Sequence, residues 1–471
     1  MSREKNLVKN TAILSLGTLF PKLIAVILTP ILTAKLSKAE FGQYDLVTTI
    51  VSLLLPALTL QISSAAFRFL IEKKNDLVEQ KSIISTIYAF VIPVSLIATM
   101  IYVLIMGGKF NFTTLLICVY FLGDILLSTT QQIIRGLGKN LLYSISCITR
   151  SIIDLILVVM LLGVVFPFSL GLNGVLIALS CATIGGLIVL FFGAHIYSLI
   201  NIKSVNRCQL FDLLKYSWPM VPNNLSTWVL RLSDRLVITA VLGIEANAVY
   251  AVANKLPNLF SAVQNTFIYA WQENASIAVN DNDKEEYYSK LCNEIWYILI
   301  GIMALLIVFT PILFHILIRG DYDEAFYQMP VLYFGMLFSC MSSVIGGIYI
   351  AYKRTVNVGL TTMVAAIVNL IIDLSFVKLI GIWAGSISTM VSYLFLVIFR
   401  MIDVQKFQRV RFEYVRIIIG FGLLVLMGFL CYQRTVISYL INVVLCMLVL
   451  YIYDKKVIKT LLATLINRYA R

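Results

Sequence analysis

The stretch WPMVPNNLSTWVLRLSDRLVITAVLGIEANAVYAVANKL, residues 218–256, places charged side chains inside an otherwise apolar segment. Its polar residues follow one another at spacings of three or four, so on a helix they form one stripe: Asn224, Thr227, Arg231, and Asp234 or Arg235. A charge at the centre of a bilayer costs roughly 2.5 to 3.5 kcal/mol even on the most lenient insertion scale. Two arginines here therefore predict an internal polar cavity rather than a lipid-facing surface.

The composition is that of an integral membrane protein. The chain has 471 residues, of which 60% are hydrophobic and 13% are charged, and its mean hydropathy is +0.91. Apolar stretches of about 20 residues, each long enough to cross a bilayer, recur along almost the whole sequence. The N-terminal segment has no small-residue cleavage site, so we expect a retained first helix and no removed signal peptide.

The apolar stretches predict an all-α polytopic fold with about fourteen transmembrane helices. Their expected ranges are 10–34, 43–66, 82–106, 113–135, 143–166, 173–199, 216–242, 247–271, 291–318, 328–352, 358–379, 380–402, 414–433 and 436–454. The turn at Lys378, Gly381 and Gly385 is the weakest division. If it were absent, the count would be thirteen, and the basic loop 400–416 would then lie outside, against the positive-inside rule. We therefore expect fourteen.

The loop charges predict one orientation, with both termini in the cytoplasm. The cations assigned to the cytoplasmic side include Arg68, Lys73, Lys74, Lys81, Arg135, Lys139, Lys203, Arg207, Lys215, Lys353, Arg354, Arg400, Lys406, Arg409, Arg411, Arg416, Lys455, Lys456, Lys459, Arg468 and Arg471. The opposite loops hold only Lys35, Lys38, Lys109, Arg319, Lys378 and Arg434. Those loops are short, which excludes a catalytic domain on that side. The cytoplasmic connection 272–290 is predicted to be a helical link.

Internal similarity predicts two lobes of six helices each. Helices one and seven both carry two prolines and a polar stripe, and Tyr44 and Tyr250 follow matching short loops. The two halves have the same orientation, so we expect an axis along the membrane normal. The predicted boundaries are 1–199 for the N-lobe, 200–402 for the C-lobe, and 403–471 for helices thirteen and fourteen with a cytoplasmic tail.

Several kinds of site are not predicted. The eight cysteines are scattered without the close pairs of metal sites or disulfide frameworks. His195 and His315 stand alone, so no metal is expected, and no cofactor-binding motif, ATP site or catalytic triad is visible. The formal charge of +13 sits in short clusters between spans rather than on one soluble face, which argues against nucleic acid as a partner.

The most specific segments of the chain resemble a known transporter family. The start of the first helix with its turn, NTAILSLGTLFPKLIAVILTPILTAKLSKAEFGQYDLVTTI, and the seventh-helix segment YSWPMVPNNLSTWVLRLSDRLVIT are similar to Wzx-type polysaccharide flippases. These belong to the multidrug, oligosaccharidyl-lipid and polysaccharide exporter superfamily. The resemblance covers nearly the whole chain. It implies two lobes around a central cavity that opens alternately to either side of the bacterial cytoplasmic (inner) membrane.

The resemblance implies a transporter rather than an enzyme. Its expected substrate is an undecaprenyl-diphosphate-linked oligosaccharide, moved from the inner to the outer leaflet for surface polysaccharide synthesis. Membrane lipids and the polysaccharide polymerase machinery are the other implied partners, and H⁺ or Na⁺ is the candidate coupling ion. A lipid II flippase is an alternative, although helix one carries Lys22 and no arginine in the membrane.

Two further functions remain as alternatives to a flippase. A multidrug or cation exporter of the same fold would be expected to have acids prevailing in the cavity. A membrane polysaccharide polymerase would be expected to have a sizeable outer loop with catalytic residues.

The cations of helices one, seven and eight are the candidate ligands of the diphosphate. Arginine holds phosphate oxygens in a bidentate fork and lysine acts as a compact point charge; the candidates are Lys22, Arg231, Arg235 and Lys255. Internal pairing with Asp234 is the competing explanation for the arginines. Asn254, Asn258 and Trp228 are the candidates for contact with the sugar.

The remaining intramembrane charges are candidates for ion coupling or for structural pairs: Asp124, Arg150, Asp154, Asp234 and Asp373. Arg150 and Asp154 are separated by four residues, which favours a mutual pair on helix five. Asp124 and Asp373 are left open between binding H⁺ or Na⁺ and balancing nearby cations.

Overall fold

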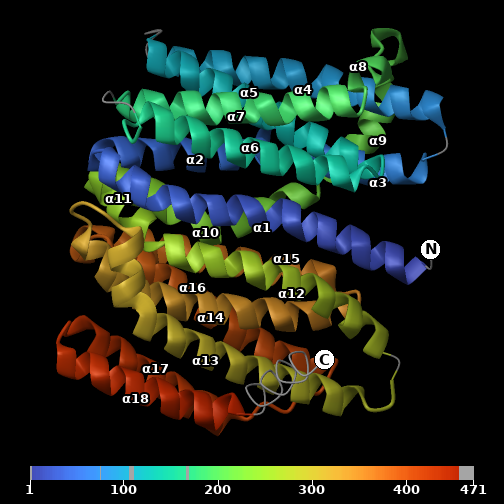
Figure 1. Cartoon of the computed structure of the whole chain (residues 1–471). Coiled ribbons are helices and arrows are strands. Elements are labelled where there is room, and N and C mark those ends of the chain that lie inside the picture. The colour runs from blue at the N-terminus through green and yellow to red at the C-terminus, as the bar shows by residue number, and fades with distance from the viewer. Residues whose placement is uncertain (1–2, 75, 106–110, 166–168, 280, 456–471) are drawn as a thin grey trace, which may run out of the picture. The chain divides into compact units, whose positions relative to one another are not determined.

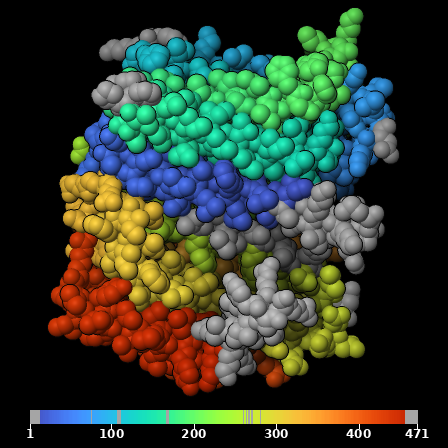
Figure 2. Space-filling model, in the orientation of Figure 1, coloured from blue at the N-terminus to red at the C-terminus, as the bar shows by residue number. Residues whose placement is uncertain are grey.

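The computed structural model describes residues 3–74, 76–105, 111–165, 169–279 and 281–455, and the described part is helical, without a strand. Side chains of residues 3–12 and of eight positions between 259 and 273 lie outside the description. The chain divides into two compact units at Ala251, and each unit is described by itself. In each, side chains fill the spaces between the ribbons (Figures 1 and 2).

The described residues of the first unit form eleven α-helices, the last of which crosses the division. They are α1 (Arg3–Lys35), α2 (Lys38–Leu58), α3 (Ile62–Glu72), α4 (Leu77–Ile105), α5 (Phe112–Gly136), α6 (Asn140–Leu161), α7 (Gly171–Gly193), α8 (Ile196–Leu199), α9 (Arg207–Ser217), α10 (Met220–Leu242) and α11 (Ile244–Ala253). Helix α6 packs between α1 and α7, and α5 packs on the other side of α7 (Figure 1). Helix α10 packs on α2.

The second unit is built around α14. Its helices are α12 (Lys255–Ala278), α13 (Lys284–Leu317), α14 (Asp323–Ala351), α15 (Thr355–Ile380), α16 (Trp383–Asp403), α17 (Tyr414–Tyr432) and α18 (Val436–Tyr453). The apolar span of α14 is 89% buried, and α12, α13 and α16 pack against it. Helices α17 and α18 pack on each other and on α13 (Figure 1).

The membrane architecture predicted from the sequence is confirmed. Twelve helices of the described chain are long and apolar enough to cross a bilayer. They match the predicted helices except the seventh and eighth, 216–242 and 247–271, which carry the polar residues of the opening stretch. The total of fourteen remains a prediction, as do the lobe boundaries at residues 199 and 402.

Three predicted helices are interrupted. The range 43–66 divides into α2 and α3 because Leu60 and Gln61 adopt left-handed backbone conformations. The range 173–199 divides at His195 for the same reason. The range 247–271 divides at Asn254, because Pro257 has no N–H to donate to the carbonyl of Ala253. Hydropathy alone does not reveal such breaks, since the flanking residues stay apolar.

The weakest predicted turn is present in the structure. Gly381 has a φ of +60° and separates α15 from α16. The connection 272–290 is largely helical as predicted, since α12 extends to Ala278 and α13 begins at Lys284. At its end, Glu285 lies 2.9 Å from Arg411.

The assignment of Arg400 to a cytoplasmic loop is wrong. The side chain of this residue is buried on α16. Its guanidinium donates to the hydroxyls of Thr361 and Thr362 and to the carbonyl of Ser342, without a carboxylate partner among the described residues. This arginine therefore joins α14, α15 and α16. Lys456, Lys459, Arg468 and Arg471 lie outside the described residues.

Candidate functional site

Two of the predicted phosphate ligands lie in the same part of the first unit. Lys22 is nine residues into the apolar span of α1, which runs from Ile13 to Lys35, and Arg231 stands midway along α10. Both side chains are exposed, and they are close enough for their charges to repel. Within the described part of the chain, neither forms an ion pair. Exposed cations at this depth require water or an anion rather than lipid around them.

Arg235 is engaged in a buried ion pair with α2. Its Nη1 lies 2.5 Å from Oδ1 of Asp45 and 3.3 Å from the hydroxyl of Thr49. The amide of Asn247 also donates to Asp45, across 3.4 Å. The charge of Arg235 is therefore already balanced, so its predicted contact with substrate has a direct competitor in Asp45.

Asp234 is also buried, and the hydroxyl of Tyr250 donates to it across 2.6 Å. The single polar stripe expected on α10 is thus divided. Arg231 is exposed, whereas Asp234 and Arg235 face neighbouring helices. The expectation of one uniformly accessible stripe was wrong, because α2 packs over Arg235 and supplies Asp45 as its partner, whereas Arg231, one turn earlier, stays exposed.

Trp228 attaches α10 to α2 two turns before Arg235. Its ring is buried, and its indole N–H donates to the hydroxyl of Ser52 across 3.0 Å. The N-terminal part of α2 also approaches α11 closely, since a Cβ on Gly42 would lie 2.2 Å from the carbonyl oxygen of Ile244. These contacts hold α10 and α11 firmly against α2. The predicted sugar contact of Trp228 remains a prediction.

Arg150 pairs with a different acid from the one predicted by its spacing. Its Nη2 lies 2.8 Å from Oδ1 of Asp124 on α5, so the expected mutual pair with Asp154 was wrong. The long arginine side chain reaches the neighbouring helix instead of running along its own. Asp154 remains within electrostatic reach of Arg150, and its Oδ1 is buried without a hydrogen-bond partner among the described residues.

The candidates of the second unit lie on two helices. Asn254 caps α12, Lys255 is its first residue, and the side chain of Asn258 is exposed. On α15, Asn369 and Asp373 are fully buried, and Asn369 donates to Ser388 of α16. Convergence of Lys255 with Lys22 and Arg231 remains a prediction. No cluster of metal-ligating side chains occurs among the described residues.

Sequence reasoning missed three partners that the structure brings together. Asp45 lies inside an apolar span but is not among the predicted intramembrane charges. Asn247 stands at the start of the predicted helix 247–271 without a predicted role, and Tyr250 marks the internal repeat without a predicted partner. An acid inside an apolar span is itself a signal for a buried cation, so Asp45 was detectable from the sequence.

A comparison with protein families identifies the chain over more than half its length. Residues 7–272 match the model of a family described as "Polysaccharide biosynthesis protein". The chain belongs to this family. The matched region runs from α1 to α12 and includes Lys22, Asp45, Arg231 and Arg235 of this family member. No curated protein matches its sequence.

Solved transporter structures share the fold of this polysaccharide biosynthesis family member. A structure described as lipid II flippase MurJ in an inward closed conformation is 15% identical, with a TM-score of 0.69, over 95% of this chain and 99% of that chain. An inward-facing multidrug resistance MATE transporter of the MOP superfamily is 12% identical, with a TM-score of 0.66, over 83% of this chain and 95% of that chain. At these identities the similarity establishes the fold alone.

Proposed function

We propose that this protein is a flippase that moves a polyprenyl-diphosphate-linked oligosaccharide from the inner to the outer leaflet of the bacterial cytoplasmic membrane. The proposal rests on the exposed cations Lys22, midway along the membrane span of α1, and Arg231, midway along α10, in a polysaccharide biosynthesis family member. A diphosphate that crosses the membrane carries its negative charges through the hydrocarbon core, where the free-energy cost of an isolated charge is highest. Fixed cations in a wet cavity lower that cost.

The charge of the site distinguishes this function from export of cationic drugs. Arg235 is paired with Asp45 and Asp234 is buried, so the exposed charges beside α10, those of Lys22 and Arg231, are positive. A cationic ligand would be repelled there, whereas phosphate oxygens accept from both side chains. The proposed substrate is therefore anionic and lipid-linked.

Movement of the substrate requires an energy source or a gradient. We propose that Asp154, whose buried Oδ1 has no hydrogen-bond partner in the described part, carries the coupling proton. The Asp154→Asn variant is then expected to keep substrate binding and to lose the dependence of transport on a proton gradient. Retained gradient dependence would remove Asp154 from this role and leave Na⁺ at Asp373 as the other candidate.

The decisive experiment measures the lipid-linked intermediate in cells depleted of the protein. Mass spectrometry should find polyprenyl-diphosphate oligosaccharides accumulating while surface polysaccharide is lost. Arg231→Ala and Lys22→Ala should each lower export by about tenfold or more at unchanged protein level, since each removes charge-assisted hydrogen bonds. Lys378→Ala, an exposed cation at the end of α15, serves as the matched control. Normal export in both Arg231→Ala and Lys22→Ala would contradict the proposal. Sensitivity of the depleted cells to drugs, without accumulation of the lipid-linked intermediate, would favour a drug exporter.

A further inference from the structure

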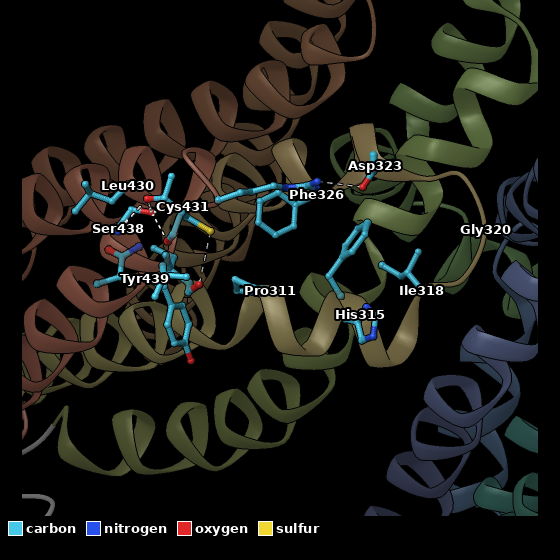
Figure 3. A pocket seen from close by; sticks show the side chains of 16 residues that line it. Pro311, His315, Ile318, Gly320, Asp323, Phe326, Leu430, Cys431, Ser438 and Tyr439 are labelled. Atoms are coloured by element: carbon cyan, nitrogen blue, oxygen red, sulfur yellow. Dashed lines mark hydrogen bonds and ion pairs between the residues drawn. The ribbon is translucent and has the colours of Figure 1, made fainter.

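A cavity of about 520 Å³ lies in the second unit. It is bounded by α13 and the start of α14 on one side and by α17 and α18 on the other. Figure 3 shows Phe326, Asp323, Ile318 and His315 opposite Leu430, Cys431, Ser438 and Tyr439, with Pro311 between them. The connection from α17 to α18 lines one end of the cavity through Arg434 and Thr435, and this end is called its mouth.

The inner part of this cavity is apolar and has the depth of one membrane leaflet. On α13 its lining runs along one face from Ile307 through Pro311 to His315, and Ile318 follows directly after the end of the helix. From Ile307 to the end of α13 the helix rises by about 15 Å, which is half of a hydrocarbon core of about 30 Å. The surface beside it is also apolar and exposed, with Val436 at 76% and Ile316 at 54% exposure. Lipid therefore has direct access to the cavity.

The mouth carries a guanidinium that is held in place but only partly engaged. Arg434 lies over the rings of Phe326, at 4.1 Å, and Tyr327, at 4.9 Å. The one hydrogen bond that its guanidinium makes within the described part runs from Nη1 to Asp323, across 3.1 Å. Asp323 is 73% exposed, so this pair is of the weak surface kind. Most of the five N–H donors of Arg434 remain available for phosphate oxygens.

A buried polar atom indicates that the cavity holds a ligand or water rather than a dry void. Asn442 of α18 lines the cavity and is 3% exposed. Its amide nitrogen donates to the carbonyl of Met427, but its Oδ1 has no hydrogen-bond partner among the described residues. A buried acceptor without a donor costs about 1–3 kcal/mol. The contents of the cavity therefore include a donor, such as a hydroxyl or a water that accompanies a polar head group.

We propose that this cavity is a binding site for a membrane phospholipid, with its phosphate on Arg434 and an acyl chain against Pro311 and Ile318. Asp323 acts as a competitor that occupies Arg434 when the phosphate is absent. The leaflet-deep length favours a two-chain phospholipid over a polyprenyl carrier, whose chain is much longer than one leaflet. The inference concerns a lipid bound by the second unit and does not depend on the proposed flippase function.

Native mass spectrometry of the full-length protein, with phosphatidylglycerol added in detergent, tests the proposal. Arg434→Gln should weaken the binding of one lipid by about tenfold, because it removes a charge-assisted hydrogen bond to the phosphate. Asp323→Asn should strengthen it by about two- to fivefold, because a surface competitor is removed. Lys378→Gln, an exposed cation at the same end of the second unit, should leave binding unchanged.

The two variants separate a ligand site from a purely structural ion pair. If Arg434 and Asp323 only stabilised the fold, both changes would act in the same direction, and that result would overturn the proposal. Equal binding in wild type and Arg434→Gln would also overturn it. Displacement of phosphatidylglycerol by an equal amount of polyprenyl phosphate would reject the phospholipid as the occupant. A melting curve of each variant confirms that the chain is folded in the assay.

Discussion

The intramembrane charges of the first unit fall into two classes, buried pairs and exposed cations. Asp45 and Arg235 are buried against each other, with Thr49 and Asn247 completing their hydrogen bonds. Lys22 and Arg231 are exposed and unpaired in the described structure. The first class attaches helices to one another, whereas the second is available to a ligand. Removal of either partner of a buried pair lowers the stability of the protein, because the remaining charge has no water to solvate it.

The pair Asp45 and Arg235 yields a stability prediction. Asp45→Ala should destabilise the protein by about 3–5 kcal/mol, since it leaves a buried guanidinium without its carboxylate. The double variant Asp45→Leu with Arg235→Met should recover most of that loss, because both charges are removed together. Thermal unfolding in detergent measures each effect. A double variant no more stable than Asp45→Ala would show that the pair contributes through packing and not through charge.

At the level of elements, helix breaks decide where polar groups are placed. Asn254 and Pro257 separate α11 from α12 in the segment that carries Lys255. Gly381 separates α15 from α16 with a φ of +60° and a ψ of −136°. This conformation is unfavourable for any residue with a Cβ. The turn therefore depends on glycine even though open space surrounds it.

Two glycines provide a matched test of this dependence. A Cβ at Gly381 or at Gly422 would meet nothing within 4 Å, but only Gly381 has a positive φ. Gly381→Ala should cost about 1–3 kcal/mol through backbone strain. Gly422→Ala, inside the exposed face of α17, should be neutral or stabilise by about 0.5–1 kcal/mol. Thermal unfolding of the two variants compares them directly, and equal melting temperatures would exclude strain at the turn.

At the scale of the whole molecule, the remaining prediction concerns orientation. The clustered cations favour cytoplasmic termini and a cytoplasmic connection 272–290. A cysteine replacing Asp283 should then be inaccessible to a membrane-impermeant thiol reagent added outside intact cells. A cysteine replacing Asp323 should react. The measurement requires a background without the exposed Cys181 and Cys208. Labelling at Asp283 and protection at Asp323 would reverse the topology.

The sequence by itself determined the class of fold and most helix positions. Uninterrupted apolar stretches about 20 residues long have few alternatives to a membrane helix, because the backbone must satisfy its own hydrogen bonds in lipid. The same reasoning located the polar segment around Arg231, since charges inside apolar spans are conspicuous. The turn at Gly381 followed from the positive-inside rule rather than from local propensity.

Only the tertiary structure decided which charges are paired. Spacing along one helix favoured Arg150 with Asp154, but the partner is Asp124 on a neighbouring helix. Arg235 is balanced by Asp45, 190 positions earlier in the chain, and Arg400 donates to neutral oxygens of two neighbouring helices, α14 and α15. A long side chain can reach a neighbouring helix, so its partner depends on how the helices pack. The contacts between helices, and not the spacing along the chain, therefore decide which charges are paired within the protein and which remain available to a ligand.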